Sequence, residues 1–367
     1  MLTLFLCGDV MTGRGIDQVL PHPGNPALYE PYIRDARQYV ALAEEVNGPI
    51  PRPVDWAYVW GDALSEWERM APDVKCINLE TSITRSDTPW PGKPVRYRMN
   101  PANIPCLMAA RVDSCALANN HILDWGYPGL LETLATLRQA GIHSAGVGRD
   151  LAEAEAPAVL AVGAQARVLI FACGSETSGI SPDWAATEDR PGVYLVAESD
   201  EEAVQRLAKQ VRQVKREGDI AIVSIHWGGN WGYEVPPEQR KFAHRLIDVA
   251  NVDVVHGHSS HHVKGIEIYQ GKPILYGCGD LLTDYEGIGG YESFRGDLSL
   301  MYWLRIAPST GKLVAMQMTP MHMQRFQLRH ASPKDTLWLC DTLNREGKAL
   351  GTRVERNADN TLTLHSL

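Results

Sequence analysis

Apolar runs alternate with stretches of helical periodicity from residue 1 to about residue 285. The apolar runs predict buried strands, and the stretches with an apolar residue every three or four positions predict helices. Strands that alternate with helices are typical of α/β proteins. The predicted strands are 2–7, 74–79, 113–118, 167–173, 219–225, 252–256, 266–270 and 273–277, and the predicted helices are 56–71, 127–140, 199–217 and 237–250.

The last two of these strands are joined by Gln270-Gly271-Lys272 and predict a hairpin, so the sheet is expected to be mixed. Further along, 298–306 and 312–319 read as strands. Ser332-Pro333 then begins a helix that runs to about Leu350, and a short terminal strand follows. We therefore expect a main domain over 1–330 and a C-terminal helix and strand over 331–367 that pack on it.

Two proline-rich segments, 20–55 and 85–105, interrupt the main domain as insertion loops, the first with a helical stretch at 34–46. Long loops in a compact domain often serve as lids or recognition elements. Plain surface packing is an equal alternative for both.

Polar residues stand at the C-terminal ends of five strand-like runs. In α/β folds such strand ends share one edge of the sheet, where sites form. Carboxylate, amide and imidazole groups gathered there are typical of a metal-centred hydrolytic site. The runs end in Cys7-Gly8-Asp9, Asn78-Leu79-Glu80, Asn119-Asn120-His121, Ser224-Ile225-His226 and the histidine-rich stretch His256 to His262.

The composition is that of an ordinary globular enzyme, with 44% hydrophobic and 22% charged residues in a chain of 367. A net charge of -9 argues against a nucleic-acid or acidic-membrane partner. The seven cysteines show no C-x-x-C spacing, which favours buried thiols in a reducing compartment. Neither a signal peptide nor a spanning run of about 20 apolar residues is visible, so we expect a cytoplasmic protein.

The five motifs, in this order, resemble the CapA family of poly-γ-glutamate and capsule synthesis, over roughly residues 1–330. The stretch Lys272-Pro-Ile-Leu-Tyr-Gly-Cys-Gly-Asp280 strengthens the resemblance. The pattern is also similar to that of calcineurin-type metallophosphoesterases. The resemblance implies a four-layer α/β/β/α sandwich with mixed sheets and one or two divalent cations, manganese, iron or zinc. It implies Asp9, Glu80, Asn120 and His226 as metal ligands, His258 and His261 as the final ligand pair, and His121 as general acid or stabiliser.

Two departures from the phosphoesterase pattern affect this ligand set. Met11 stands where those enzymes carry a histidine, so one metal site is expected to be weakened. The last motif reads G-H-S-S-H-H, so that His256, His258, His261 and His262 compete for two ligand places.

Other residues are candidates for orientation or substrate binding. Asp124, three residues after His121, is expected to orient that imidazole. Four basic side chains near the loops are candidates for binding a phosphate or carboxylate, with ordinary solvated charge as the alternative. Trp227 opens a glycine-rich strand exit and is a further substrate-binding candidate, and Asp284-Tyr285-Glu286 could close one side of the site. The basic candidates are Arg14, Lys93, Arg96 and Arg98.

Three functions remain open at this stage. The first is a metal-dependent hydrolase or transferase acting on a phosphoester or on a γ-glutamyl or peptide-like substrate, small or polymeric, with His121 as proton donor. The second is a Cα epimerase that uses acid and base groups on the same fold. The third is a non-catalytic factor in polymer assembly. The oligomeric state is not indicated.

Overall fold

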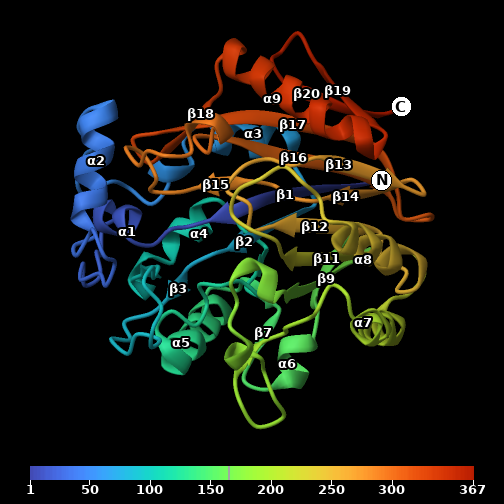
Figure 1. Cartoon of the computed structure of the whole chain (residues 1–367), viewed down its shortest axis with the longest axis horizontal. Helices are drawn as coiled ribbons and strands as arrows, with labels where there is room; N and C mark the ends of the chain where they lie inside the picture. Colours follow the sequence, from blue (N-terminus) through green and yellow to red (C-terminus); the bar gives the residue numbers. More distant parts are fainter. Residues whose placement is uncertain (164–165) are drawn as a thin grey trace.

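Two large mixed sheets form the centre of the computed structural model, which describes residues 1–163 and 166–367 (Figure 1). In the larger sheet the strands from β1 to the edge strand β6 are parallel, and the strands on the other side of β1 are antiparallel. Its order is β19 (Thr352–Arg356), β20 (Leu362–Ser366), β17 (Lys312–Gln324), β16 (Leu298–Ala307), β1 (Leu2–Val10), β2 (Val74–Leu79), β5 (Ser114–Ala116) and β6 (His143–Ala145), while β15 (Asp280–Leu282) pairs with β1 and β18 (Gln327–His330) pairs with β17.

The smaller sheet is parallel in its centre and antiparallel at both edges. Its edge hairpin, β13 with β14, confirms the predicted hairpin. Two short pairs complete the strands, β10 (Gly192–Val193) with β7 (Val147–Gly148) and β3 (Ser82–Ile83) with β4 (Arg98–Met99). The order of the smaller sheet is β13 (Ile266–Tyr269), β14 (Lys272–Leu275), β12 (Val254–His258), β11 (Ile220–His226), β9 (Ala166–Gly174) and β8 (Ala158–Val162).

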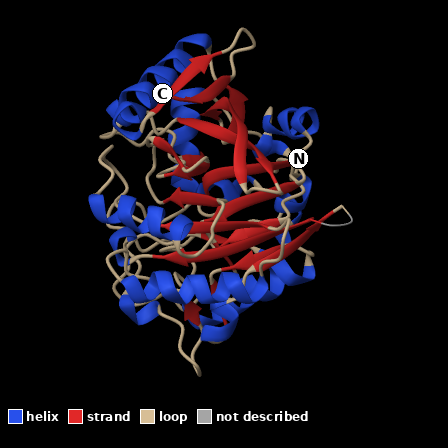
Figure 2. Cartoon of the chain, turned by 90° about the vertical axis from the view of Figure 1, so that its right-hand side faces the viewer, coloured by secondary structure: helices blue, strands red, loops and turns tan. Residues whose placement is uncertain are grey.

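Side-chain alternation along the central strands explains the layers. In β9 the side chains of Val168 and Ile170 belong to the core shared with the larger sheet, whereas Leu169 and Phe171 pack on the other face with α7 and α8. On the outer face of the larger sheet, the ring of Phe5 packs edge-on against Trp67 of α3. Figure 2 shows both layers of strands enclosed by helices, so the predicted α/β/β/α sandwich with mixed sheets is confirmed.

The helices are α1 (Gly15–Val19), α2 (Arg37–Asn47), α3 (Ala63–Met70), α4 (Pro105–Ala109), α5 (Gly126–Gln139), α6 (Leu151–Glu155), α7 (Glu201–Val214), α8 (Pro237–Asp248) and α9 (Pro333–Gly347). None of them, in the part of the chain that the structure describes, has both the length and the apolar character to cross a membrane.

Two predicted elements need correction, and several short or edge strands were not predicted. The helix expected over 56–71 is broken into a 3-10 turn at Tyr58–Trp60 and α3, because Gly61 lies between them with φ 43° and its backbone approaches Leu328 closely. The C-terminal segment contains two strands rather than one, and they extend the larger sheet next to β17. Strand β8 was not predicted.

Candidate functional site

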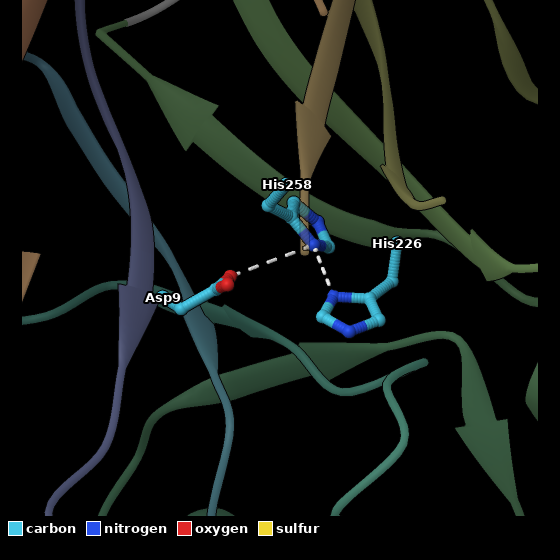
Figure 3. A group of neighbouring side chains, drawn as sticks. All are labelled: Asp9, His226 and His258. Carbon is cyan, nitrogen blue, oxygen red and sulfur yellow. Dashed lines mark hydrogen bonds and ion pairs between the residues drawn. The ribbon is translucent and has the colours of Figure 1, made fainter. Parts of the chain in front are cut away.

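The predicted ligands come together where strand ends of the two sheets meet. Asp9 lies near the end of β1 and Glu80 directly after β2, both in the larger sheet, and Asn120 follows β5. His226 and His258 are the last residues of β11 and β12 in the smaller sheet, in register with each other. Figure 3 shows Asp9 and the two imidazoles turned toward one another. Their donor atoms lie within 4.8 Å of each other.

A chain of hydrogen bonds determines which ring nitrogen of His258 carries the proton. The backbone carbonyl of Cys7 can only accept, so Nε2 of His256, 2.7 Å away, carries a proton and Nδ1 of the neutral ring does not. Ser224 Oγ therefore donates to His256 Nδ1 at 3.0 Å and accepts from His258 Nε2 at 2.9 Å. This leaves the lone pair of His258 Nδ1 directed at the centre, as a metal ligand requires.

The His226 ring has fewer N–H donors than there are acceptor atoms next to it. Its Nδ1 lies 2.8 Å from His258 Nδ1, and its Nε2 lies 3.1 Å from Asn120 Oδ1. Burial lowers the pKa of His226 well below its usual range, so the ring is neutral and has one N–H for two acceptors. One lone pair is thus left facing another, an arrangement that a cation at this place would resolve.

Three buried carboxylates surround the same centre. Asp9 Oδ1 accepts from Asn78 Nδ2 at 2.7 Å and Asp9 Oδ2 from the backbone N–H of Ser259 at 3.2 Å. Glu80 Oε2 and Asp280 Oδ2 are buried and have no hydrogen-bond partner. Burial, and next to it the charge of Asp280, raises the pKa of Asp9 to about 7. Burial and the nearby Asp9 raise the pKa of Glu80 well above its usual range.

Unpartnered buried carboxylate oxygens are costly unless a cation or a base lies next to them. Together with the imidazole and amide donors, they form a set suited to a divalent metal such as manganese, iron or zinc. The residues present therefore fit the metal that the resemblance implies.

His121 is slightly exposed, and a carboxylate and an ammonium group bond to it or lie next to it. Its Nδ1 is 2.6 Å from Asp124 Oδ2, and its Nε2 is 3.6 Å from Glu80 Oε1. Lys93 donates to Asp124 Oδ1 and to the carbonyl of Asn120, with its ammonium 3.1 Å from His121 Nδ1. Burial lowers the pKa of His121 to about 4. Because Asp124 can accept the Nδ1 proton, His121 presents an unprotonated Nε2 to the centre.

A second imidazole–carboxylate pair lies on the Asp9 side. His261 Nδ1 is 2.9 Å from Asp280 Oδ1, and these two residues and Asp9 form another group of donors within 4.8 Å. His121 and His261 are 6% and 7% exposed, whereas Asp9, Glu80, His226 and His258 are essentially inaccessible. A substrate would therefore approach on the side of these two imidazoles.

Two tyrosines cover the space between these imidazoles. Tyr97 packs edge-on against His121 and Tyr285 edge-on against His261, and their hydroxyl oxygens are 2.8 Å apart. Tyr97 and Lys93 come from the 85–105 loop, so this loop reaches the site. The contacts of the 20–55 loop with this region go through Arg14, which bonds to Glu30 and Tyr39.

Of the four competing histidines, two have both ring nitrogens next to partners outside the centre. His256 has both nitrogens engaged by Cys7 and Ser224, and His262 has its nitrogens 3.1 Å from the Val263 carbonyl and the Gly232 N–H. This leaves His258 and His261 facing the centre, with His256 beneath it.

Three of the substrate-binding candidates are engaged elsewhere. Arg14 pairs with Asp284 and Glu30 and lies over the ring of Tyr97, and Arg98 bonds to the Ser86 and Asn25 carbonyls and to Asp87, so both guanidinium groups already have partners within the protein. Trp227 lies in the core under α7 and α8, where its indole N–H donates to the Tyr276 carbonyl. It follows His226 in sequence, and successive strand residues point to opposite faces.

Of the remaining candidates, some contact the site and others are bonded elsewhere. Arg96 donates to the Trp90 carbonyl while its Nε and one Nη are buried without a partner, and Lys93 is the basic side chain that contacts His121. Of Asp284-Tyr285-Glu286, only Tyr285 contacts the site, since Glu286 accepts from the N–H groups of Arg325 and Phe326.

Sequence reasoning assigned no role to Asp280, Ser224 or Asn78, although each lay within a stretch it had singled out. The signal for Asp280 was the repeated tripeptide Cys-Gly-Asp at 7–9 and 278–280. The signal for Ser224 was alternation, because it lies two residues before His226 and so on the same face of β11.

Comparison with known proteins places this chain in a family. The family model described as bacterial capsule synthesis protein PGA_cap matches residues 3–285. A probable polyglutamine synthesis accessory protein of Mycobacterium tuberculosis is 53% identical over 363 residues, 99% of this chain and 95% of that protein. The PGA biosynthesis protein CapA of Bacillus subtilis is 25% identical over 307 residues, 83% of this chain and 68% of that protein.

Among solved structures, one described as a novel phosphatase from Mycoplasma pneumoniae matches with a TM-score of 0.46 and 10% identity over 88% of this chain and 93% of that one. The family model and the M. tuberculosis relative each cover most of the chain. The chain therefore belongs to the bacterial capsule synthesis protein family, PGA_cap, as the resemblance to CapA predicted.

Proposed function

We propose that this protein is a metal-dependent hydrolase or transferase of capsular or poly-glutamate polymer metabolism, acting on a phosphoester or on a γ-glutamyl or peptide-like bond. The observation that carries the proposal is the excess of lone pairs at the centre: His226 has one proton for two acceptors, and Glu80 Oε2 has no partner. The polymer context is supported by the family and by the relatives named as accessory or biosynthesis proteins for such polymers.

A divalent metal bound here supplies Lewis-acid activation of water and of the scissile group. Asp9, Glu80, Asn120, His226, His258 and His261 are the residues that would hold it. The Ser224–His256 relay keeps His258 in the tautomer that can ligate. Since His258 and His226 end neighbouring strands in register, the protein holds these donors in place before any metal arrives.

His121 would move the proton. With its Nδ1 hydrogen-bonded to Asp124, it takes a proton at Nε2 from the attacking group and returns it to the leaving group. It therefore acts first as a base and then as the donor expected from the sequence. Lys93, held against Asp124 and the Asn120 carbonyl, keeps this pair fixed and adds a positive charge next to an anionic substrate.

A second candidate function, Cα epimerisation, is favoured by one particular observation. Two histidine–carboxylate pairs, His121 with Asp124 and His261 with Asp280, lie at the two ends of the Tyr97–Tyr285 pair. A pair of bases on different sides of a substrate is what removal and return of an α-proton on opposite faces requires. The two candidates assign different roles to His261, a ligand in the first and a base in the second.

We also propose that the protein acts in the cytoplasm. All seven cysteines are free and buried, which is consistent with the reducing cytoplasm expected from the sequence.

The test is a substrate screen with metal-depleted protein supplied in turn with manganese, iron and zinc. The substrates are phosphomonoesters, phosphodiesters and γ-glutamyl peptides, and a parallel assay follows uptake of solvent deuterium at Cα. We expect metal-dependent release of phosphate or of a free amine. We also expect His121→Ala to lower that rate by about 10²–10⁴-fold, the usual contribution of a positioned acid–base group.

The matched control is His143→Ala, which removes an exposed imidazole at the start of β6 and is expected to leave turnover unchanged. Deuterium uptake without bond cleavage would select epimerisation instead. Absence of both metal binding and turnover would reject both enzymatic functions and leave a role in polymer assembly.

A further inference from the structure

The two Cys-Gly-Asp tripeptides of the chain lie side by side. Strand β15 pairs in parallel with β1, and the register sets Asp280 opposite Asp9. The two backbones approach so closely that a Cβ on Gly8, within β1, would lie 1.5 Å from the Gly279 carbonyl oxygen, which only glycine permits. The fold thus delivers a second aspartate to the centre from a strand distant in sequence.

Asp280 has an oxygen without a hydrogen-bond partner at the centre where this chain lacks the histidine of the phosphoesterase pattern. Its Oδ1 accepts from His261 Nδ1 at 2.9 Å, while Oδ2 is buried with no partner. The Met11 thioether, which stands in the place of the missing histidine, lies 3.6 Å from the Tyr285 hydroxyl. Asp9, His261 and Asp280 each offer a donor atom within 4.8 Å of the others.

The two groups of donors differ in chemical character. The first, Asp9 with His226 and His258, is dominated by imidazole nitrogen, and the second, Asp9 with His261 and Asp280, by carboxylate oxygen. Imidazole-rich sites suit zinc and iron, whereas carboxylate-rich sites suit manganese and magnesium. Two carboxylates also balance the charge of a divalent ion in a buried place.

We propose that Asp280 is a ligand of a second cation, held with Asp9 and His261, and that this site takes a hard divalent ion such as Mn²⁺ or Mg²⁺ while the His226–His258 site takes zinc or iron. The inference rests on the proposed metal-dependent function. It makes the centre a mixed one, in which an aspartate from β15 takes the place left by Met11.

The experiment measures metal content and affinity rather than turnover. Metal-depleted protein is titrated calorimetrically with Mn²⁺ and with Zn²⁺, bound metal is counted by elemental analysis, and Mn²⁺ occupancy is read by electron paramagnetic resonance. We expect two ions per chain. Asp280→Asn keeps the hydrogen-bond acceptor for His261 but removes the charge, and it is expected to weaken Mn²⁺ binding at least about 100-fold while zinc binding stays within about threefold.

His226→Ala is the converse variant, expected to lose zinc and to retain Mn²⁺. Circular dichroism and a thermal melt establish that each variant is folded, and Asp280→Glu serves as the second variant if Asp280→Asn does not fold. Two ions in Asp280→Asn with unchanged Mn²⁺ affinity would overturn the inference, since Asp280 would then only orient His261. A single ion in the wild type would overturn it as well, whereas absence of any bound metal in the wild type would reject the proposed function itself.

Discussion

Replacing Ser224 by alanine tests the hydrogen-bond relay behind the site and leaves every proposed ligand in the sequence unchanged. Ser224 Oγ lies 3.0 Å from His256 Nδ1 and 2.9 Å from His258 Nε2, and the whole group is buried. Without the hydroxyl, the N–H of His258 loses its acceptor and Nδ1 of His256 loses its donor. A buried polar group left without a partner costs about 1–3 kcal/mol, so we expect a loss of about 2–4 kcal/mol in the free energy of unfolding.

The same change should weaken metal binding. Once Ser224 no longer accepts from Nε2, the proton of His258 can move to Nδ1, the nitrogen that faces Asp9 and His226. Loss of such an orienting partner usually costs about 10–100-fold in metal affinity, or about 1.4–2.7 kcal/mol. Calorimetric titration of metal-depleted protein gives the affinity, and urea unfolding in the presence of chelator gives the stability separately.

Ser299→Ala is the matched control for this experiment. Ser299, in β16, is also buried, but its hydroxyl has no hydrogen-bond partner, so its removal should lower neither the metal affinity nor the stability. If Ser224→Ala bound metal as tightly as the wild type, His258 would not depend on the relay for its tautomer. A stability loss alone would then reduce Ser224 to a packing role.

Two further changes test the fold around the site. Burial lowers the pKa of His256 to about 4, below its ordinary value of about 6.5, so between these values the unfolded chain binds a proton that the folded chain does not. The free energy of unfolding should therefore decrease, by up to about 3 kcal/mol, as the pH is lowered from about 6.5 to about 4. In urea unfolding the wild type should lose this amount relative to His256→Gln. A difference between the two proteins that does not depend on pH would mean that the imidazole is not neutral in the fold. Gly61→Ala should cost about 3 kcal/mol, because φ is 43° and the new Cβ would lie 2.2 Å from the Leu328 carbonyl oxygen. Gly48→Ala, with φ 82° and open space around it, should cost only about 1 kcal/mol in the same thermal melt, and equal losses would contradict the clash.

Strand alternation accounts for what the sequence could predict at the site and for one of its errors. The apolar runs located the strands whose ends carry Asp9, Glu80 and His226, and parallel strands bring such ends to one edge. The same rule places Trp227 on the face opposite His226, in the core beneath the helices. The glycine-rich strand exit suggested a binding role for Trp227, but the alternation of side chains along β11 and into this residue decides its direction.

The break at Gly61 and the pairing partners of Arg14 and Arg98 could not be read from local pattern. The helical periodicity of 56–71 is real, but the approach of Leu328, more than 250 residues later, leaves no room for a Cβ at Gly61, which also has a φ of 43°. In the same way, the guanidinium of Arg14 lies against Asp284 because β15 pairs with β1. Contacts between such distant segments depend on register, which local sequence does not contain.

Met11 shows why the motif alone gave an incomplete account of the centre. Met11 directly follows β1, and without a histidine at this position one donor is missing from this segment. Read across the sheet, Asp280 lies opposite Asp9 because β15 adds in parallel to β1, and its carboxylate reaches the same centre. A donor can therefore be lost from one strand and supplied by its neighbour while the fold and the position of the site stay the same. Because a metal responds to the atoms around it and not to their order in the chain, the donor set must be counted in space before a site is judged weak.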